Sequence, residues 1–381
     1  IAIGPNGSFQ YNRSNNLNPF ANNLAGTGTL VKTNIGELGL TGTNSFSGTI
    51  DIQQGKLGLS GSACLNGAPN VNVGANGILS VGTGFLGGTA TIGKLSGSGL
   101  IDPVYGQGTA VRSLQVNQAA DGVFSGILAD GSSGRILAFI KAGAAMLTLS
   151  GTNTYSGGTT VSNGALLVNG AISNSAVSVK SGATLGGIGV VAGVVSVESG
   201  GTLSPGISIG TLAMNSSLTL AGTTFVEVNA TNGQCDRIQG LTNLAYGGNL
   251  VVSNLAGGDN PPTLGQTFQL FTVPATRSGN FSTITPALTA GKLWSFNPTS
   301  GVLNVVSGTA TYPTNITSSL MGGNLSLTWP ASHLGWVVQS NIRGLANPGN
   351  WFDIPGSSSV TNLNIVPTLT WTNVFYRLRA P

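Results

Sequence analysis

The chain has 381 residues, of which 40% are apolar and 6% are charged, whereas about 25% of the residues of an ordinary globular domain are charged. Its net charge is +4, and its 14 Lys and Arg residues are scattered singly. This composition excludes a disordered chain, which combines low hydrophobicity with high net charge, and the lack of a basic cluster argues against a nucleic-acid partner. The surface must therefore consist mainly of Ser, Thr, Asn and Gly.

The sequence begins at Ile1 and contains neither a signal-peptide pattern nor a run of about 18 apolar residues. We therefore predict no transmembrane segment. Two explanations of this beginning remain open: a signal peptide has been removed, or the sequence starts inside a longer chain.

Residues 1–23 hold short apolar fragments among Asn, Gly and Pro. One interpretation is an irregular first coil or cap of the domain that follows. The other is an arm, Ile1–Tyr11, that adds itself as a strand to a neighbouring subunit. In that case four apolar residues would lie at the subunit interface: Ile1, Ile3, Phe9 and Tyr11.

Residues 24–205 contain a repeated pattern. In Leu147–Gly170, alternating apolar residues are interrupted by Ser-Gly, Gly-Gly and Asn-Gly, which predicts short strands joined by tight turns. The motif V-x-x-G-x-x-L recurs at a constant step, beginning at Val161, Val179 and Val197. Such a regular step predicts the coils of a parallel β-solenoid, stacked about 4.8 Å apart.

The run L-x-L-x-G-T-N-T-Y-S-G-G-T-T-V-x-x-G-x-L at Leu147–Leu166 resembles the autotransporter-associated β-strand repeat of secreted and surface proteins of Gram-negative bacteria. Leu38–Gly61, an earlier copy, carries the same motif with substitutions. The resemblance implies a right-handed parallel β-helix that is exported to the cell surface, and it implies no catalytic chemistry and no cofactor. The outer-membrane barrel that usually ends proteins of this family, with strands of about ten residues, is not recognised in this sequence.

Residues 206–307 contain longer strands and resemble the segment that closes the β-helix in this family. We therefore predict the continuation and the C-terminal cap of the solenoid here, because an uncovered solenoid end exposes unpaired strand groups. Asp236 beside Arg237 is interpreted as a salt bridge in a turn or a solvated pair rather than as a catalytic acid.

Residues 308–381 contain four of the five Trp residues and short strands with a turn about every 10–12 residues, which predicts a small β-sandwich. The segment resembles a fibronectin-III-like or immunoglobulin-like module. Its Trp residues are expected in the sandwich core, and the alternative is a platform for sugar stacking at Trp336 and Trp351. The single histidine, His333, is expected in a surface loop.

The two cysteines, Cys64 and Cys235, are distant from each other in the sequence. Along a solenoid their separation exceeds the Cα distance of about 7 Å that a disulfide can span. We expect two independent buried thiols, and a disulfide between neighbouring subunits is the alternative.

The ten acidic residues are dispersed along the chain, and the sequence has no metal-binding or phosphate-binding motif. We therefore predict an all-β, non-catalytic structural protein of the cell exterior, whose subunits associate by strand addition or head-to-tail contacts into a filament or surface layer. Two alternatives remain open: an adhesin that binds an extracellular polysaccharide, and a polysaccharide-processing β-helix enzyme. No metal or cofactor is expected.

Overall fold

The computed structural model describes residues 1–20, 22–60, 65, 68–82, 89–103, 111–258, 260–288, 291–308, 314–330, 333, 335–345, 348–366 and 373–380. The chain forms two compact units. The first comprises residues 1–259, 268–285 and 297–302, and the second comprises residues 260–267, 286–296 and 303–381. In the part of the chain that the structure describes, no helix is long and apolar enough to cross a membrane.

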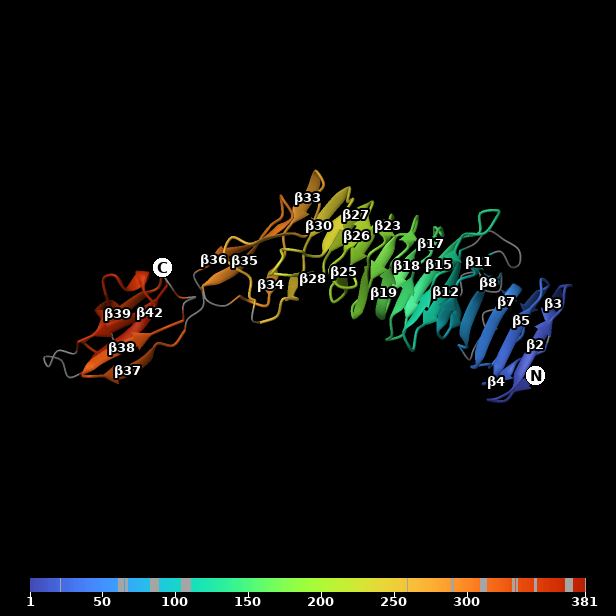
Figure 1. Ribbon diagram of the computed structural model, residues 1–381, viewed down its shortest axis with the longest axis horizontal. Coiled ribbons are helices and arrows are strands. Elements are labelled where there is room, and N and C mark those ends of the chain that lie inside the picture. The colour runs from blue at the N-terminus through green and yellow to red at the C-terminus, as the bar shows by residue number, and fades with distance from the viewer. Residues whose placement is uncertain are drawn as a thin grey trace. The chain divides into compact units, whose positions relative to one another are not determined.

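The first unit is a parallel β-solenoid, in which equivalent strands of successive turns lie side by side (Figure 1). One column of strands has nine members in spatial order. They are β33 (Thr276–Gly279), β30 (Asn243–Tyr246), β27 (Ser217–Leu220), β24 (Val195–Val197), β21 (Val177–Val179), β18 (Thr159–Val161), β15 (Leu137–Ala142), β12 (Arg112–Asn117) and β9 (Thr89–Ile92).

A second, shorter column has five members. They are β17 (Thr152–Asn153), β20 (Ala171–Ile172), β23 (Val190–Val191), β26 (Thr211–Met214) and β29 (Arg237–Gln239).

The third column runs the length of the unit. Its strands are β2 (Ser8–Asn12), β5 (Thr29–Thr33), β7 (Thr49–Leu59), β8 (Asn70–Val81), β10 (Leu95–Gly97), β13 (Gly122–Phe124), β16 (Leu147–Leu149), β19 (Gly164–Val168), β22 (Ala183–Gly187), β25 (Thr202–Pro205), β28 (Thr223–Val228), β31 (Asn249–Asn254) and β34 (Thr283–Thr285). The two long strands β7 and β8 also pair with short strands of neighbouring turns. Strand β7 pairs with β6 (Glu37–Leu40), and β6 also pairs with β3 (Leu17–Phe20). Strand β8 pairs with β11 (Leu100–Asp102), and β11 also pairs with β14 (Ile127–Leu128). The parallel pair β1 (Ala2–Ile3) and β4 (Ala25–Gly26) joins the first turn to the second.

The stacked turns enclose a continuous apolar core. Val161, Val179 and Val197 follow one another in register, and each is 0% exposed. The Gly of the repeated motif stands at the same turn in each coil, with φ of 63° at Gly164 and 79° at Gly182, a left-handed conformation that favours glycine. The all-β fold with a parallel solenoid is therefore confirmed.

The first residues of the chain form the first turn of this solenoid. β1 pairs with β4 and β2 pairs with β5, both in parallel, and the side chains of Ile3 and Tyr11 are buried at 4% exposure. In this structure the segment predicted as an arm or a first coil is thus paired within its own chain.

The second unit contains two small antiparallel sheets. One has the order β37 (Thr317–Met321), β38 (Asn324–Thr328), β41 (Asn362–Ile365), and the other has the order β40 (Phe352–Asp353), β39 (Val337–Asn341), β42 (Phe375–Arg379). Leu327, Trp329 and Val338 are the centre of the core between them. Two short 3-10 helices lie in the same unit, η3 (Pro348–Asn350) and η4 (Ser357–Ser359). The remaining strands of the chain are β32 (Thr267–Gln269), β35 (Lys292–Asn297) and β36 (Val302–Ser307).

Candidate functional site

The first turn of the solenoid carries an open row of main-chain groups. Among the described residues, β1, β2 and β3 each pair on one side only. The carbonyl of Gly7 accepts the N–H of Thr29 at 2.9 Å. The main-chain groups of successive residues in a strand alternate between its two sides, so the N–H and C=O groups of Phe9 and Tyr11 also point toward β5. The N–H and C=O groups of Ser8, Gln10 and Asn12 therefore point to the open side.

The four residues predicted at a subunit interface fall into two pairs. Ile3 and Tyr11 belong to the core of their own solenoid, and the Tyr11 hydroxyl lies within hydrogen-bonding distance of two main-chain carbonyls, of Asn15 and Glu37. Ile1 is 47% exposed, and Phe9 is half-buried with its ring 6.4 Å from that of Phe20. A contact with a neighbour would thus use the strand edge and the Ile1 side chain, because detachment of the whole segment would uncover buried residues.

Charged side chains are scarce at this edge. In residues 1–20 the sequence has one charged side chain, Arg13. The amino group of Ile1 donates a hydrogen bond to the carbonyl of Asn23 at 2.6 Å. Natural edge strands are usually kept from pairing by charges, bulges or Pro. The edge of β2 therefore has little to prevent the addition of another strand.

Two buried lysines hold the turns of the repeats together. Lys32 and Lys141 stand at the same position of the two repeat copies, and both are 0% exposed. The Nζ of Lys141 donates to the carbonyls of Ala142, Gly143 and Asn163 at 2.9–3.0 Å, so that it joins two successive turns. Lys32 is held by three carbonyls in the same way.

Burial sets the pKa of these lysines. Desolvation lowers the pKa of Lys141 to about 8, against the opposing effect of the negative charge of Asp121, and it also lowers the pKa of Lys32. Neither lysine belongs to a catalytic or metal-binding motif of the sequence. The signal that could have found them is the recurrence of Lys at one position of both repeat copies.

A buried asparagine has an equivalent role at another corner of the repeat. Asn153, which is 0% exposed, accepts the N–H of Leu128 at 3.0 Å and donates to the carbonyls of Gly151 and Ala171. It thereby connects three turns. Its counterpart Asn44 is also buried and accepts the N–H of Leu24.

Asp236 is not the solvated residue that the sequence suggested. Its side chain is 1% exposed, and its two carboxylate oxygens accept the N–H groups of Gly210 at 2.8 Å and Glu227 at 2.7 Å. Burial raises its pKa to about 6, against the effect of these hydrogen bonds. The prediction of a solvated pair with Arg237 was wrong, because the fold buries the carboxylate against the main-chain N–H groups of Gly210 and Glu227.

Of the two cysteines, Cys64 lies outside the described residues. Cys235 is a free thiol, 7% exposed, and its Sγ donates to the carbonyl of Gln269 at 3.4 Å. Burial raises the pKa of this thiol. The disulfide between subunits stays a prediction.

The aromatic residues of the second unit correct the expectation for His333 and bear on the alternative of sugar stacking. His333 is 1% exposed, with its ring 5.0 Å from that of Trp336, so it is not in a surface loop. Trp336 is itself 3% exposed and offers no open ring for a sugar. Trp351 is half-buried, and the guanidinium of Arg377 lies 4.3 Å from its ring centre. A stacking platform at Trp336 does not fit this structure.

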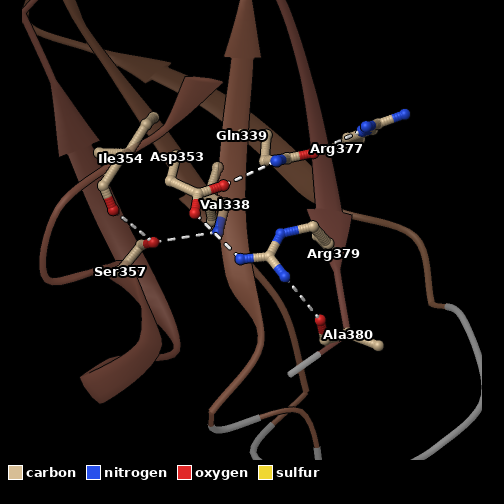
Figure 2. A network of polar contacts seen from close by, with 8 residues as sticks. All are labelled: Val338, Gln339, Asp353, Ile354, Ser357, Arg377, Arg379 and Ala380. Carbon is tan, nitrogen blue, oxygen red and sulfur yellow. Dashed lines mark hydrogen bonds and ion pairs between the residues drawn. The ribbon is translucent and has the colours of Figure 1, made fainter. Parts of the chain in front are cut away.

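A polar network joins β39, β40 and β42 (Figure 2). Asp353 accepts hydrogen bonds from Gln339 at 2.6 Å and from Arg379 at 2.9 Å, and Arg377 donates to Gln339 at 2.8 Å. These hydrogen bonds hold the pKa of Asp353 below its usual value, with the largest effect from Arg379. Nearby, Ser357 accepts the N–H of Val338 and donates to the carbonyl of Ile354. The network fixes the sheet rather than gathering free catalytic groups.

Within the described residues, no group of three or more His, Cys, Asp and Glu side chains could hold a metal ion. A family model described as the passenger-associated-transport-repeat matches residues 30–59 and 139–168. These segments contain the lysine and asparagine pairs described above. No curated protein matches the chain.

Proposed function

We propose that this chain, whose repeats and solenoid support an autotransporter passenger-like β-helix, is a non-catalytic structural protein of the exterior of a Gram-negative bacterium. Passenger repeats imply secretion to the cell exterior, and proteins that carry them are generally structural. The subunits would associate end to end into a filament or surface layer.

The observation that supports this proposal is the open edge of β2. Among the described residues, no strand pairs with the outward main-chain groups of Ser8, Gln10 and Asn12, and few charges keep a further strand away. A contact between this edge and a different surface of the next subunit is heterologous, so it continues into a fibre unless the rotation closes a ring. The adhesin alternative retains one candidate ring, Trp351, one face of which is occupied by Arg377.

The test is a proline at the open edge of the full-length chain. Gln10→Pro removes one outward N–H and leaves the hydrogen bonds of Phe9 and Tyr11 to β5 intact. Gln10→Ala, the matched control, keeps that N–H. We expect concentration-dependent association of the parent and of the control in sedimentation velocity, with filaments in electron micrographs, and weaker association of the proline variant.

Two results would contradict the proposal. One is a parent that stays monomeric at all concentrations. The other is a proline variant that assembles as well as the alanine control while both have the same unfolding midpoint.

A further inference from the structure

The edge strand β42 of the second unit exposes main-chain groups. The carbonyl of Val338 accepts the N–H of Ile354 at 2.8 Å, and the N–H of Val338 donates to Ser357, so Val338 faces β40. Its neighbour Gln339 must then face β42, where it lies opposite Arg377. By the alternation of an antiparallel pair, Tyr376 and Leu378 point their N–H and C=O groups away from β39. Among the described residues, no strand pairs with β42 on that side.

Two hollows adjoin this edge. One has a volume of about 500 Å³ and lies between residues 314–316 and the segment Tyr376–Leu378. The other has a volume of about 450 Å³, lies between the two sheets, and is lined by Tyr376 together with mainly apolar side chains such as Leu325, Ile354 and Ile365. A strand added to β42 would lie about 4.8 Å from it.

The side chains of β42 indicate the chemistry of such a strand. Tyr376 and Leu378 are half-buried and pack against the core, whereas Arg377 and Arg379 are exposed on the outer face. From Leu303 to Pro381 the sequence has three arginines and one acid, Asp353, so its net charge is +2. An added strand places alternate side chains on the same two faces. Acidic side chains would lie opposite Arg377, which donates to Gln339, and Arg379, which pairs with Asp353 and keeps 46% of its side chain exposed. The residues between them would face the apolar hollow.

We propose that the open edge of β42 binds an extended segment of a partner protein, in which acidic and apolar residues alternate, as an added β-strand. A second copy of β42 is a poorer occupant, because an antiparallel pair of such strands would bring arginine side chains close to each other. The proposal concerns the second unit and does not depend on association through the first turn of the solenoid.

The test measures binding of two labelled peptides, (Val-Glu)4-Val and (Val-Lys)4-Val, to the full-length chain by fluorescence anisotropy. We expect the Glu peptide to bind, with salt-sensitive affinity, and the Lys peptide to bind at least about tenfold more weakly. Arg377→Gln should weaken binding of the Glu peptide about two- to fivefold. Arg343→Gln, which removes an equal charge from a loop of the same unit, should leave it unchanged.

A second measurement reports strand addition directly. Bound Glu peptide should protect the amides of Tyr376 and Leu378 from hydrogen exchange. Two peptides N-methylated at alternate residues, one at the odd and one at the even positions, should differ: only the peptide whose methyl groups replace the N–H groups that face β42 should fail to bind. Equal binding of both peptides, absence of binding, or protection elsewhere would each overturn the proposal. So would a dimer that forms through β42 and excludes the peptide.

Discussion

Lys32 and Lys141 show how single residues stabilise this solenoid. Each ammonium group is buried among three main-chain carbonyls and joins one turn to the next. Burial of the charge is unfavourable, as the lowered pKa of Lys141 shows, and the three hydrogen bonds offset that cost. The same residue at the same position of both matched repeats makes this contact part of the repeat's construction.

Lys141→Met should therefore reduce the free energy of unfolding by about 1–3 kcal/mol, because three buried carbonyls lose their donor. Lys180→Met, which removes an exposed partner of Glu198, should change it little. Since the folded-state pKa of Lys141, about 8, lies below the unfolded value, its contribution to stability rises with pH between about 8 and 10.5. Urea unfolding at several pH values measures both effects. A methionine variant with parental stability and parental pH dependence would contradict this account.

Asp236 gives the opposite pH dependence. Its folded-state pKa, about 6, lies above the ordinary value of 3.8, so the contribution of this group is fully present below about 3.8 and is lost as pH rises through 6. Asp236→Asn removes the titratable carboxyl group and also one of the two oxygens that accept main-chain N–H groups. The difference in unfolding free energy between parent and variant should then change between pH 4 and 6 and stay constant above pH 7. A difference that is constant from pH 4 to 7 would show that Asp236 does not titrate in this window.

At the scale of the strands, stability comes from in-register apolar columns. Leu166, Leu185 and Leu203 follow one another through β19, β22 and β25, and each is 0% exposed. A turn cannot bury its own apolar side, so each leucine depends on the turns above and below it. The alternation along each strand places Thr184, the neighbour of Leu185, on the outer face.

Leu185→Ala should reduce the free energy of unfolding by about 2–5 kcal/mol, because it leaves a cavity between two turns. Thr184→Ala, its neighbour on the outer face, should reduce it much less. Urea unfolding followed by far-ultraviolet circular dichroism compares the two variants. Equal effects would mean that Leu185 is not a closely packed core position.

At the scale of the whole molecule, the scarcity of charge is the feature that connects fold and function. A solenoid removes strand edges along its length by stacking, and among the described residues the turn that contains β2 pairs on one side only. In the described part of the second unit, β42 likewise pairs on one side only. With 6% charged residues, the chain has few charges to keep either edge from pairing. Association through strand edges therefore underlies both proposals made above.

The sequence by itself determined the solenoid. Its constant repeat step, its alternation and its turn glycines are local patterns, and stacking identical patterns has one low-energy solution in which equivalent residues fall into register. The two repeat copies were found for the same reason. The small antiparallel sheets of the second unit also followed from turn spacing and aromatic content.

Only the tertiary structure decided which polar and aromatic side chains are buried. Asp236 reaches main-chain groups of Gly210 and Glu227, and His333 packs against Trp336. Such contacts depend on which loops cover a residue, and no local periodicity encodes that. The open sides of β2 and β42 could not be predicted from the sequence either. The order of the strands must be known before one can say which described main-chain groups have no strand partner.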